Sequence, residues 1–574
     1  IDWSWNLLDP AGQAAMRALS VFPGGFTAGA ARHLLGADAL PAVEQLADQS
    51  LLKVVDTTSG SRYRMLETVR EFAAARREDA GETERVTSRF LAWARDFGVA
   101  HHDSALTDDD LLAVELLRAE QDNLVLALRH GLSRQDAGTV AAVSAVLGGL
   151  WVVEGNFARL IAMAADTVRI LPPFRPEADL VEATRSSLVL GAMSGFLLRG
   201  PSPARFVVGL RRLPPAPPDT VARAAQAVVS AMFGSPEAGL ATLSALAGSD
   251  QPLLAGMASQ VASYAWEEAG DLDGALAAAR RSLAAFEGRG SAWVLAAAHS
   301  RIGELCLEAG PGSGDDALHH LSAALAVAET FGAWSSANRL REAIVGAHLQ
   351  RGAYDDAERE LKLTTPHGAD EPWDMSMFDT TMRAQIALGR GDVDTGLQLW
   401  RTAAATLRDT PPGPGGDLSR LDAWALQVQA TTVVAHLYHG RPGLVAEITE
   451  ALPATLSALT ANQEPSPGTL AASYDLAVCG SLLLALAVSD IDRGQRAADP
   501  GLTRSGARMI ALADRFGLKN GLHSTMSAAR ARQVAQNADQ PAYDEAVSSY
   551  AGLDTAGLRA AAIAALRERA RISG

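Results

Sequence analysis

Apolar residues recur at helical spacing from residue 81 to the last residues of the chain, in segments separated by short turns that contain glycine. The clearest unit is Met257 to Phe286, in which one helix stops at Gly270 and Asp271 begins the next. The turn glycines are spaced by 45, 34, 36, 44, 38, 39 and 49 residues: Gly155, Gly200, Gly234, Gly270, Gly314, Gly352, Gly391 and Gly440. Such intervals are typical of two-helix solenoid repeats. We therefore predict stacked helical hairpins that form an α-solenoid superhelix.

A small residue follows several of these turns at the same place in the second helix, at Ala275, Ala317, Ala357 and Gly396. Two helices can cross closely there because no large side chain separates them. The units resemble degenerate tetratricopeptide (TPR) repeats. One hairpin buries too little surface to be stable alone, so stacking creates one continuous core and a concave face. The architecture suits binding of a ligand or a protein partner, and an inert spacer is the alternative.

The first 77 residues follow a different pattern. Their apolar positions predict three short helices, two strands joined by a turn at residues 57–60, and a further helix that starts at Glu67. The three helices begin at Asp9-Pro10, Thr27 and Asp38, and the strands cover residues 51–55 and 62–66. This order is that of a winged helix. We predict a winged-helix domain at 1–77, a helical connector at 78–150 and TPR-like repeats at 151–574, in a mostly all-α fold with one small β-hairpin.

Charge argues against a nucleic-acid partner. The chain has 50 basic and 66 acidic residues, for a formal net charge of −16. The third predicted helix contains Asp38, Glu44 and Asp48 but no lysine or arginine. A recognition helix of that sign would repel phosphate. We therefore expect no direct nucleic-acid contact, and a winged helix that serves protein–protein contact.

Cysteine content and hydropathy bear on the compartment. Cys306 and Cys479 stand far apart without a metal-binding pattern, which favours buried thiols in a reducing compartment. The longest apolar stretches, residues 140–153 and 476–488, are shorter than the roughly 18–20 residues that span a bilayer. No signal-peptide pattern opens the sequence. We expect a cytoplasmic protein without a membrane segment, and we interpret the chain as a piece of a longer one.

Three segments closely resemble the winged-helix module of bacterial STAND regulators, which are signal-transducing ATPases with numerous domains: residues 19–26, 46–52 and 62–73. Among such regulators, these segments resemble those of the large AfsR-like antibiotic regulators of the SARP class. Residues 119–128 resemble the segment that those proteins place before their repeats. The resemblance implies an NB-ARC-type nucleotide-binding domain upstream of the winged helix, with ATP or ADP and Mg²⁺ bound there.

No GxxxxGK[ST] motif occurs in this chain, so we expect no cofactor and no ATPase activity in it. Relatives of the resembled family carry Met-His-Asp after the second strand, where this sequence has Met65-Leu66-Glu67. Leucine cannot donate a hydrogen bond to a phosphate. We predict that Met65, Leu66, Glu67 and Arg70 face the upstream nucleotide domain. The alternative for Glu67 is a purely local role at the start of its helix.

A candidate partner-binding segment interrupts the repeats at Thr364 to Phe378, which shows no helical period. Trp373, Met375 and Met377 are its recognition residues, because an aromatic ring among methionines on a long loop suits protein contact. Trp266 and Tyr264 are further candidates. The alternatives are a linker for the loop and core packing for the helical aromatics. We predict no metal site, because His436 and His439 lack an acidic third ligand in reach.

These observations favour a signal-sensing and autoinhibitory region of a STAND-type ATPase transcriptional regulator. In that hypothesis the helical repeats bind a ligand or a partner protein and restrain the upstream ATPase. The alternative is a stand-alone TPR-like scaffold for protein–protein interaction with no link to nucleotide.

Overall fold

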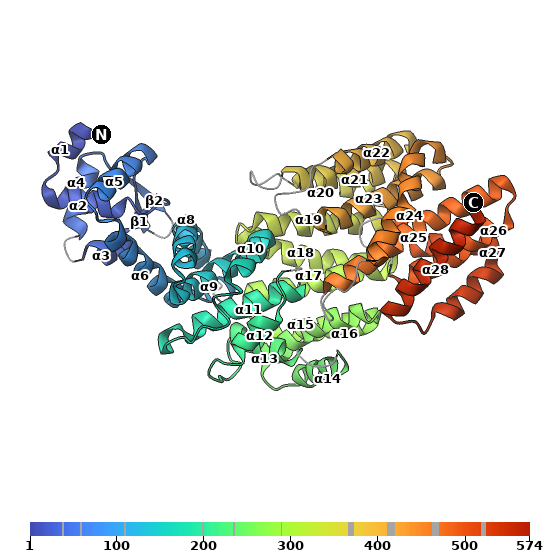
Figure 1. Ribbon diagram of the computed structural model, residues 1–574, viewed down its shortest axis with the longest axis horizontal. Helices are drawn as coiled ribbons and strands as arrows, with labels where there is room; N and C mark the ends of the chain where they lie inside the picture. The colour runs from blue at the N-terminus through green and yellow to red at the C-terminus, as the bar shows by residue number, and fades with distance from the viewer. Residues whose placement is uncertain are drawn as a thin grey trace. The chain divides into compact units, whose positions relative to one another are not determined.

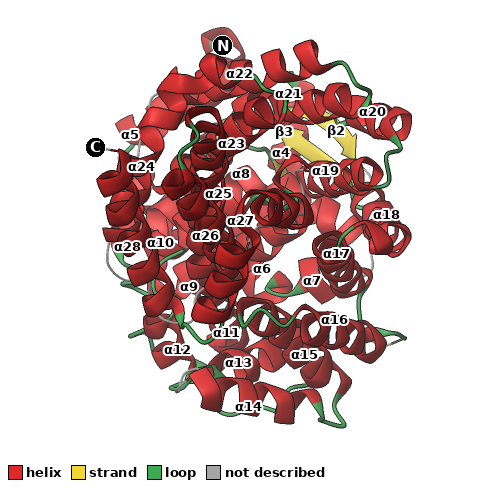
Figure 2. Ribbon diagram, turned by 90° about the vertical axis from the view of Figure 1, so that its right-hand side faces the viewer, coloured by secondary structure: helices red, strands yellow, loops and turns green. Residues whose placement is uncertain are grey.

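The computed structural model is built from helices and one small sheet, in agreement with the predicted fold class (Figure 1 and Figure 2). It describes residues 1–36, 39–57, 60–107, 111–197, 200–232, 236–288, 290–364, 372–409, 419–461, 470–517 and 524–573. Contacts between Cα atoms separate two compact units. The first contains Ile1–Ala262, Arg281–Ala296 and Val327–Ala333, and the second contains Ser263–Arg280, Ala297–Ala326 and Trp334–Gly574.

The amino-terminal part of the first unit is a winged helix, as predicted. Its helices are α1 (Asp2–Leu7), α2 (Pro10–Leu19), α3 (Ala28–Leu35), α4 (Ala39–Asp48) and α5 (Glu67–Asp79). Its strands are β1 (Phe26–Thr27), β2 (Lys53–Thr57) and β3 (Gly60–Arg64), in the antiparallel order β1-β3-β2. The Asp9 and Thr27 side chains cap α2 and α3 by accepting from the amides of Gly12 and Ala30.

Two details of the winged helix differ from the sequence-based prediction. The hairpin strands lie closer to the turn than predicted, because Thr57 pairs directly with Gly60. Helix α1 and the two-residue strand β1 were not predicted. Phe26 of β1 pairs with Tyr63 of β3, and a strand this short has no periodicity to reveal it.

A group of helices follows the winged helix in the first unit: α6 (Thr83–His101), α7 (Ser104–Thr107), α8 (Leu111–Arg134), α9 (Ala137–Glu154) and α10 (Phe157–Thr167). Helix α9 is long and apolar enough to span a membrane by length and composition. However, 78% of its apolar window is buried in the protein, against α6, α8 and α11 (Val181–Leu197) among others. Burial on all sides explains why α9 lacks a polar face.

Further helices make up the rest of the described chain. The helices are α12 (Ala204–Leu210), α13 (Val221–Ala231), α14 (Pro236–Ala247), α15 (Pro252–Glu268), α16 (Leu272–Phe286), α17 (Ala292–Ala309), α18 (Gly314–Thr330), α19 (Trp334–Gln350), α20 (Tyr354–Leu363), α21 (Pro372–Gly389), α22 (Val393–Asp409), α23 (Ser419–Tyr438), α24 (Ala446–Ala461), α25 (Leu470–Ala497), α26 (Pro500–Arg515), α27 (Ala528–Tyr550) and α28 (Thr555–Ser573). Short 3₁₀ helices η1 (Ala178–Leu180), η2 (Pro311–Ser313), η3 (Pro442–Val445) and η4 (Ser524–Met526) lie between them.

Most of the predicted turn glycines end helices. Gly155, Gly270, Gly352, Gly391 and Gly440 have positive φ angles between 68° and 85°, which glycine adopts without strain. Gly314 instead begins α18, and Gly310, with φ of 99°, makes the preceding turn. Gly200 does not adopt a left-handed conformation, and Gly234 lies outside the described residues. Ala275, Ala317 and Ala357 are fully buried, as expected for close helix crossings.

The prediction that residues 364–378 form a loop is partly wrong. Helix α21 begins at Pro372, so the segment is helical from that residue onward. Proline suits the first turn of a helix because its amide has no hydrogen to leave unbonded there. Pro372 was predicted to lie in a loop, whereas it opens a helix.

Candidate functional joint at helix α8

The turn between α2 and β1 places backbone polar groups where helix α8 can bind them. Gly25 has a φ of +76°, and a Cβ atom there would lie only 2.6 Å from the Tyr63 carbonyl oxygen. The turn therefore requires glycine at that position. On α8, the Asn123 side chain accepts from the Gly24 amide at 3.1 Å and donates to the Gly25 carbonyl at 2.8 Å.

A buried ion pair completes this contact. Arg62 of β3 donates to the Glu120 carboxylate of α8 at 2.5 Å and to the Gly25 carbonyl at 3.2 Å. The second Glu120 oxygen accepts from the Asn123 side chain at 2.6 Å. Only 8% of the Arg62 side chain and 2% of the Glu120 side chain are exposed. Buried charges of this kind are tolerated where every partner is satisfied. We call Arg62, Glu120, Asn123 and the Gly24-Gly25 turn the α8 joint.

The α8 joint suggests a structural role for residues 119–128, the segment that resembles part of the STAND regulators. Glu120 and Asn123 are three residues apart, so they lie on the same face of α8. The resemblance identified this segment but did not predict that it contacts the winged helix. Arg62 was not predicted as a functional residue. Its signal in the sequence was weak, since an arginine within a hairpin strand is usually exposed.

Other residues of α8 tie it to α9. Gln121 accepts from the Trp151 indole at 3.0 Å, and Arg118 donates to Glu154 at 2.8 Å. Helix α8 therefore binds the winged helix with one set of side chains and the following helices with another.

The predicted nucleotide-domain contacts lie at the start of α5. Met65 is buried in the winged helix, whereas 62% of Leu66 is exposed. Glu67 and Arg70 form an exposed ion pair at 2.5 Å. The hydrogen bond from Arg70 lowers the pKa of the Glu67 carboxyl. Leu66, Glu67 and Arg70 therefore lie on the surface, whereas Met65 does not.

The predicted partner-binding residues fall into two groups. Tyr264 is half-buried on α15, and its ring lies 3.8 Å from the Arg301 guanidinium of α17, which also pairs with Glu267 at 2.6 Å. Tyr264 is therefore engaged in packing between neighbouring repeats. Trp266 is half-buried on the same helix. The side chains of Trp373, Met375 and Met377 lie outside the described part of the structure.

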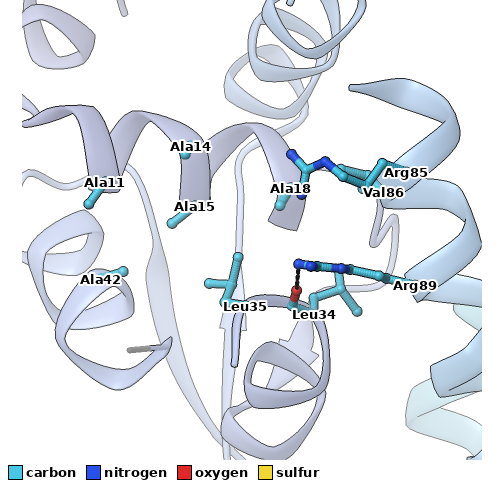
Figure 3. A pocket seen from close by; sticks show the side chains of 10 residues that line it. All are labelled: Ala11, Ala14, Ala15, Ala18, Leu34, Leu35, Ala42, Arg85, Val86 and Arg89. Atoms are coloured by element: carbon cyan, nitrogen blue, oxygen red, sulfur yellow. Dashed lines mark hydrogen bonds between the residues drawn. The ribbon is translucent and has the colours of Figure 1, made fainter. Parts of the chain in front are cut away.

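A small cavity lies between α2, α3 and α4 of the winged helix and the following helix α6 (Figure 3). It has a volume of about 250 Å³ and is lined by alanines of α2 and by Leu34, Leu35, Ala42, Arg85, Val86 and Arg89. Both guanidinium groups already have partners. Arg85 pairs with Glu82 at 3.1 Å, and Arg89 donates to the Leu34 carbonyl at 2.8 Å. The cavity was not predicted from the sequence, because its lining comes from four separate helices.

Comparisons with known proteins give a short match to transcriptional regulators. No family model matches the chain. Putative HTH-type transcriptional regulators of Mycobacterium bovis and Mycobacterium tuberculosis are 39% identical over 90 residues. That match covers 15% of this chain and only 10% of each relative.

Among solved structures, the chain resembles a STAND protein with a tetratricopeptide repeat sensor from Pyrococcus horikoshii at 12% identity and a TM-score of 0.35. The alignment covers 95% of this chain and 65% of that one. A TM-score of that size does not establish a shared fold.

Proposed function

We propose that this chain is the signal-sensing and autoinhibitory region of a STAND-type ATPase transcriptional regulator. The observation that carries the proposal is the α8 joint, which ties a winged helix to the helices that lead into a repeat array. A connection of that kind can transmit a change in the repeats to the winged helix. The short match to HTH-type transcriptional regulators supports a role in transcription.

The partner of the winged helix in this proposal is an NB-ARC-type nucleotide-binding domain, which holds ATP or ADP with Mg²⁺. Leu66, which is 62% exposed and lies just before α5, would contribute the apolar part of that contact. Glu67 and Arg70 would form its polar rim. The assignment to the AfsR-like class of antibiotic regulators, and a cytoplasmic location, belong to the same proposal.

The reading frame upstream of Ile1 gives the first test of this proposal. We expect it to encode a GxxxxGK[ST] motif within a few hundred residues. The second test co-purifies that nucleotide-binding domain with this chain. Leu66→Glu should abolish co-purification, and Val208→Glu, at a site with 46% exposure on α12, should not. The absence of an upstream P-loop would contradict the proposal and favour a stand-alone scaffold.

The repeats supply the binding surface for a ligand or partner protein in this proposal. The proposed contact residues are Trp373, Met375, Met377, Trp266 and Tyr264. Capture of a partner by the whole chain should be lost in Trp373→Ala. It should persist in Trp334→Ala, which removes a tryptophan with 45% exposure from another helix. If both variants lose partner capture equally, Trp373 is not the specific contact.

We propose that DNA binding and catalysis belong to other parts of the regulator. Glu44 and Asp48 are exposed on α4, the helix that would enter the major groove. Their charge disfavours contact with phosphate. The purified chain should therefore fail to shift DNA fragments from the regulated promoters in a gel assay at physiological salt. A specific shift would contradict this part of the proposal.

A further inference from the structure

Two turns of the repeats contact α7 and α8, although many helices separate them along the chain. The Ser291 hydroxyl donates to the Leu106 carbonyl at 2.7 Å, across 185 residues of sequence. The Arg118 guanidinium donates to the Phe331 carbonyl at 3.3 Å, across 213 residues. In a solenoid each repeat contacts its neighbours. These bonds skip α9 to α16 and are therefore not part of ordinary stacking.

The two turn regions also pack against each other. Phe331 is only 6% exposed, and its ring meets the Trp293 ring edge-on at a centroid distance of 6.4 Å. Ala333 is fully buried and Ala105 is 5% exposed. Residues 281–296 and 327–333 group with the amino-terminal unit, while their neighbours in sequence belong to the second unit.

We propose that these two turns and α7–α8 form a clasp that closes in the resting state and opens when a signal binds the repeats. Arg118 is its central residue, because Glu154 fixes the guanidinium at 2.8 Å while the same group binds Phe331. Helix α8 also carries Glu120 and Asn123 of the α8 joint. Opening the clasp releases α8 from the repeats and, through Glu120 and Asn123, loosens the α8 joint with the winged helix. The signal itself rests on the proposed function, whereas the clasp does not.

Hydrogen–deuterium exchange of the whole chain tests the clasp. In Arg118→Glu, peptides over residues 104–107 and 327–333 should exchange about tenfold faster, which corresponds to about 1.4 kcal/mol. Arg134→Glu is the matched control, because Arg134 lies on the same helix and its ion pair with Glu84, at 2.6 Å, is outside the clasp. Equal exchange at 104–107 and 327–333 in both variants would overturn the proposal.

Ser291→Ala provides a milder variant in case Arg118→Glu disturbs folding. It removes one hydroxyl, so circular dichroism should remain unchanged while exchange rises at residues 104–107 and 290–296. An unchanged exchange rate there would also overturn the clasp. Both measurements use this chain alone, so their outcome is independent of whether a nucleotide-binding domain partners the winged helix.

Discussion

Arg62, Glu120 and Asn123 show how a few side chains can fix one domain against another. Each is buried, and each makes more than one hydrogen bond, so no member can be removed without leaving a polar group unsatisfied. Breaking a buried ion pair costs more than the pair contributes, because a buried charge remains. The α8 joint should therefore be sensitive to single substitutions and more tolerant of a double one.

Glu120→Leu should lower the free energy of unfolding by about 3–5 kcal/mol, since Arg62 is left buried without a counter-charge. Arg62→Met with Glu120→Leu should recover part of that loss. Urea denaturation of the purified chain measures both. The control is Glu84→Gln, which removes an exposed ion pair and should cost less than about 1 kcal/mol. A loss of that small size in Glu120→Leu would contradict the importance of the joint.

Glu82 should make stability depend on pH. Hydrogen bonds from Arg17 to Glu82, at 2.8 and 3.1 Å, lower its pKa below 4.5 in the folded state. Its stabilising effect is therefore full above pH 4.5 and declines as the pH falls through the folded-state pKa. Wild type should exceed Glu82→Gln in melting temperature at pH 7, and the difference should shrink below pH 4.5. A constant difference across that range would contradict this assignment.

At the scale of elements, the carboxy-terminal helix is more than the plain Ala/Arg-rich segment that its sequence indicates. Arg569 of α28 donates to both oxygens of Asp490 on α25, at 2.8 and 3.1 Å. Asp490 is fully buried within the described structure. The pair fixes α28 onto the large apolar core formed by α23 to α27.

Arg569→Ala should destabilise this unit in a pH-dependent manner. Burial raises the pKa of Asp490, and the hydrogen bond from Arg569 opposes that rise. Without Arg569 the folded-state pKa is higher still, so stability is retained at low pH and lost as the pH rises through that value. The melting temperature of the variant should match wild type more closely at pH 5 than at pH 8. A deficit that is larger at pH 5 would contradict this account.

The elements were predictable where local chemistry determined them. Asp9 and Thr27 cap their helices as predicted, and five of the predicted glycines adopt the left-handed conformation that ends a helix. The start of α21 was misread because Pro372 suits both a loop and a first helical turn. Arg62, Arg118 and Ser291 could not be predicted, because their roles depend on contacts between segments that are distant in sequence.

At the scale of the whole molecule, α8 is the element through which the repeats and the winged helix communicate in this account. The clasp consists of two hydrogen bonds from the turns to α7 and α8, and a ring contact between Trp293 and Phe331 joins the two turns. Each such bond contributes about 0.5–3 kcal/mol. A signal that binds the open form better by a few kcal/mol would therefore be enough to open it.

The Gly24 amide provides the most direct test of this coupling, because it donates to Asn123 within the α8 joint. Hydrogen–deuterium exchange of a peptide over residues 22–27 should be measured in wild type, Arg118→Glu and the control Arg134→Glu. The account predicts faster exchange in this peptide only when the clasp residue Arg118 is replaced. If residues 327–333 exchange faster in Arg118→Glu while residues 22–27 remain as in wild type, the repeats do not communicate with the winged helix through α8.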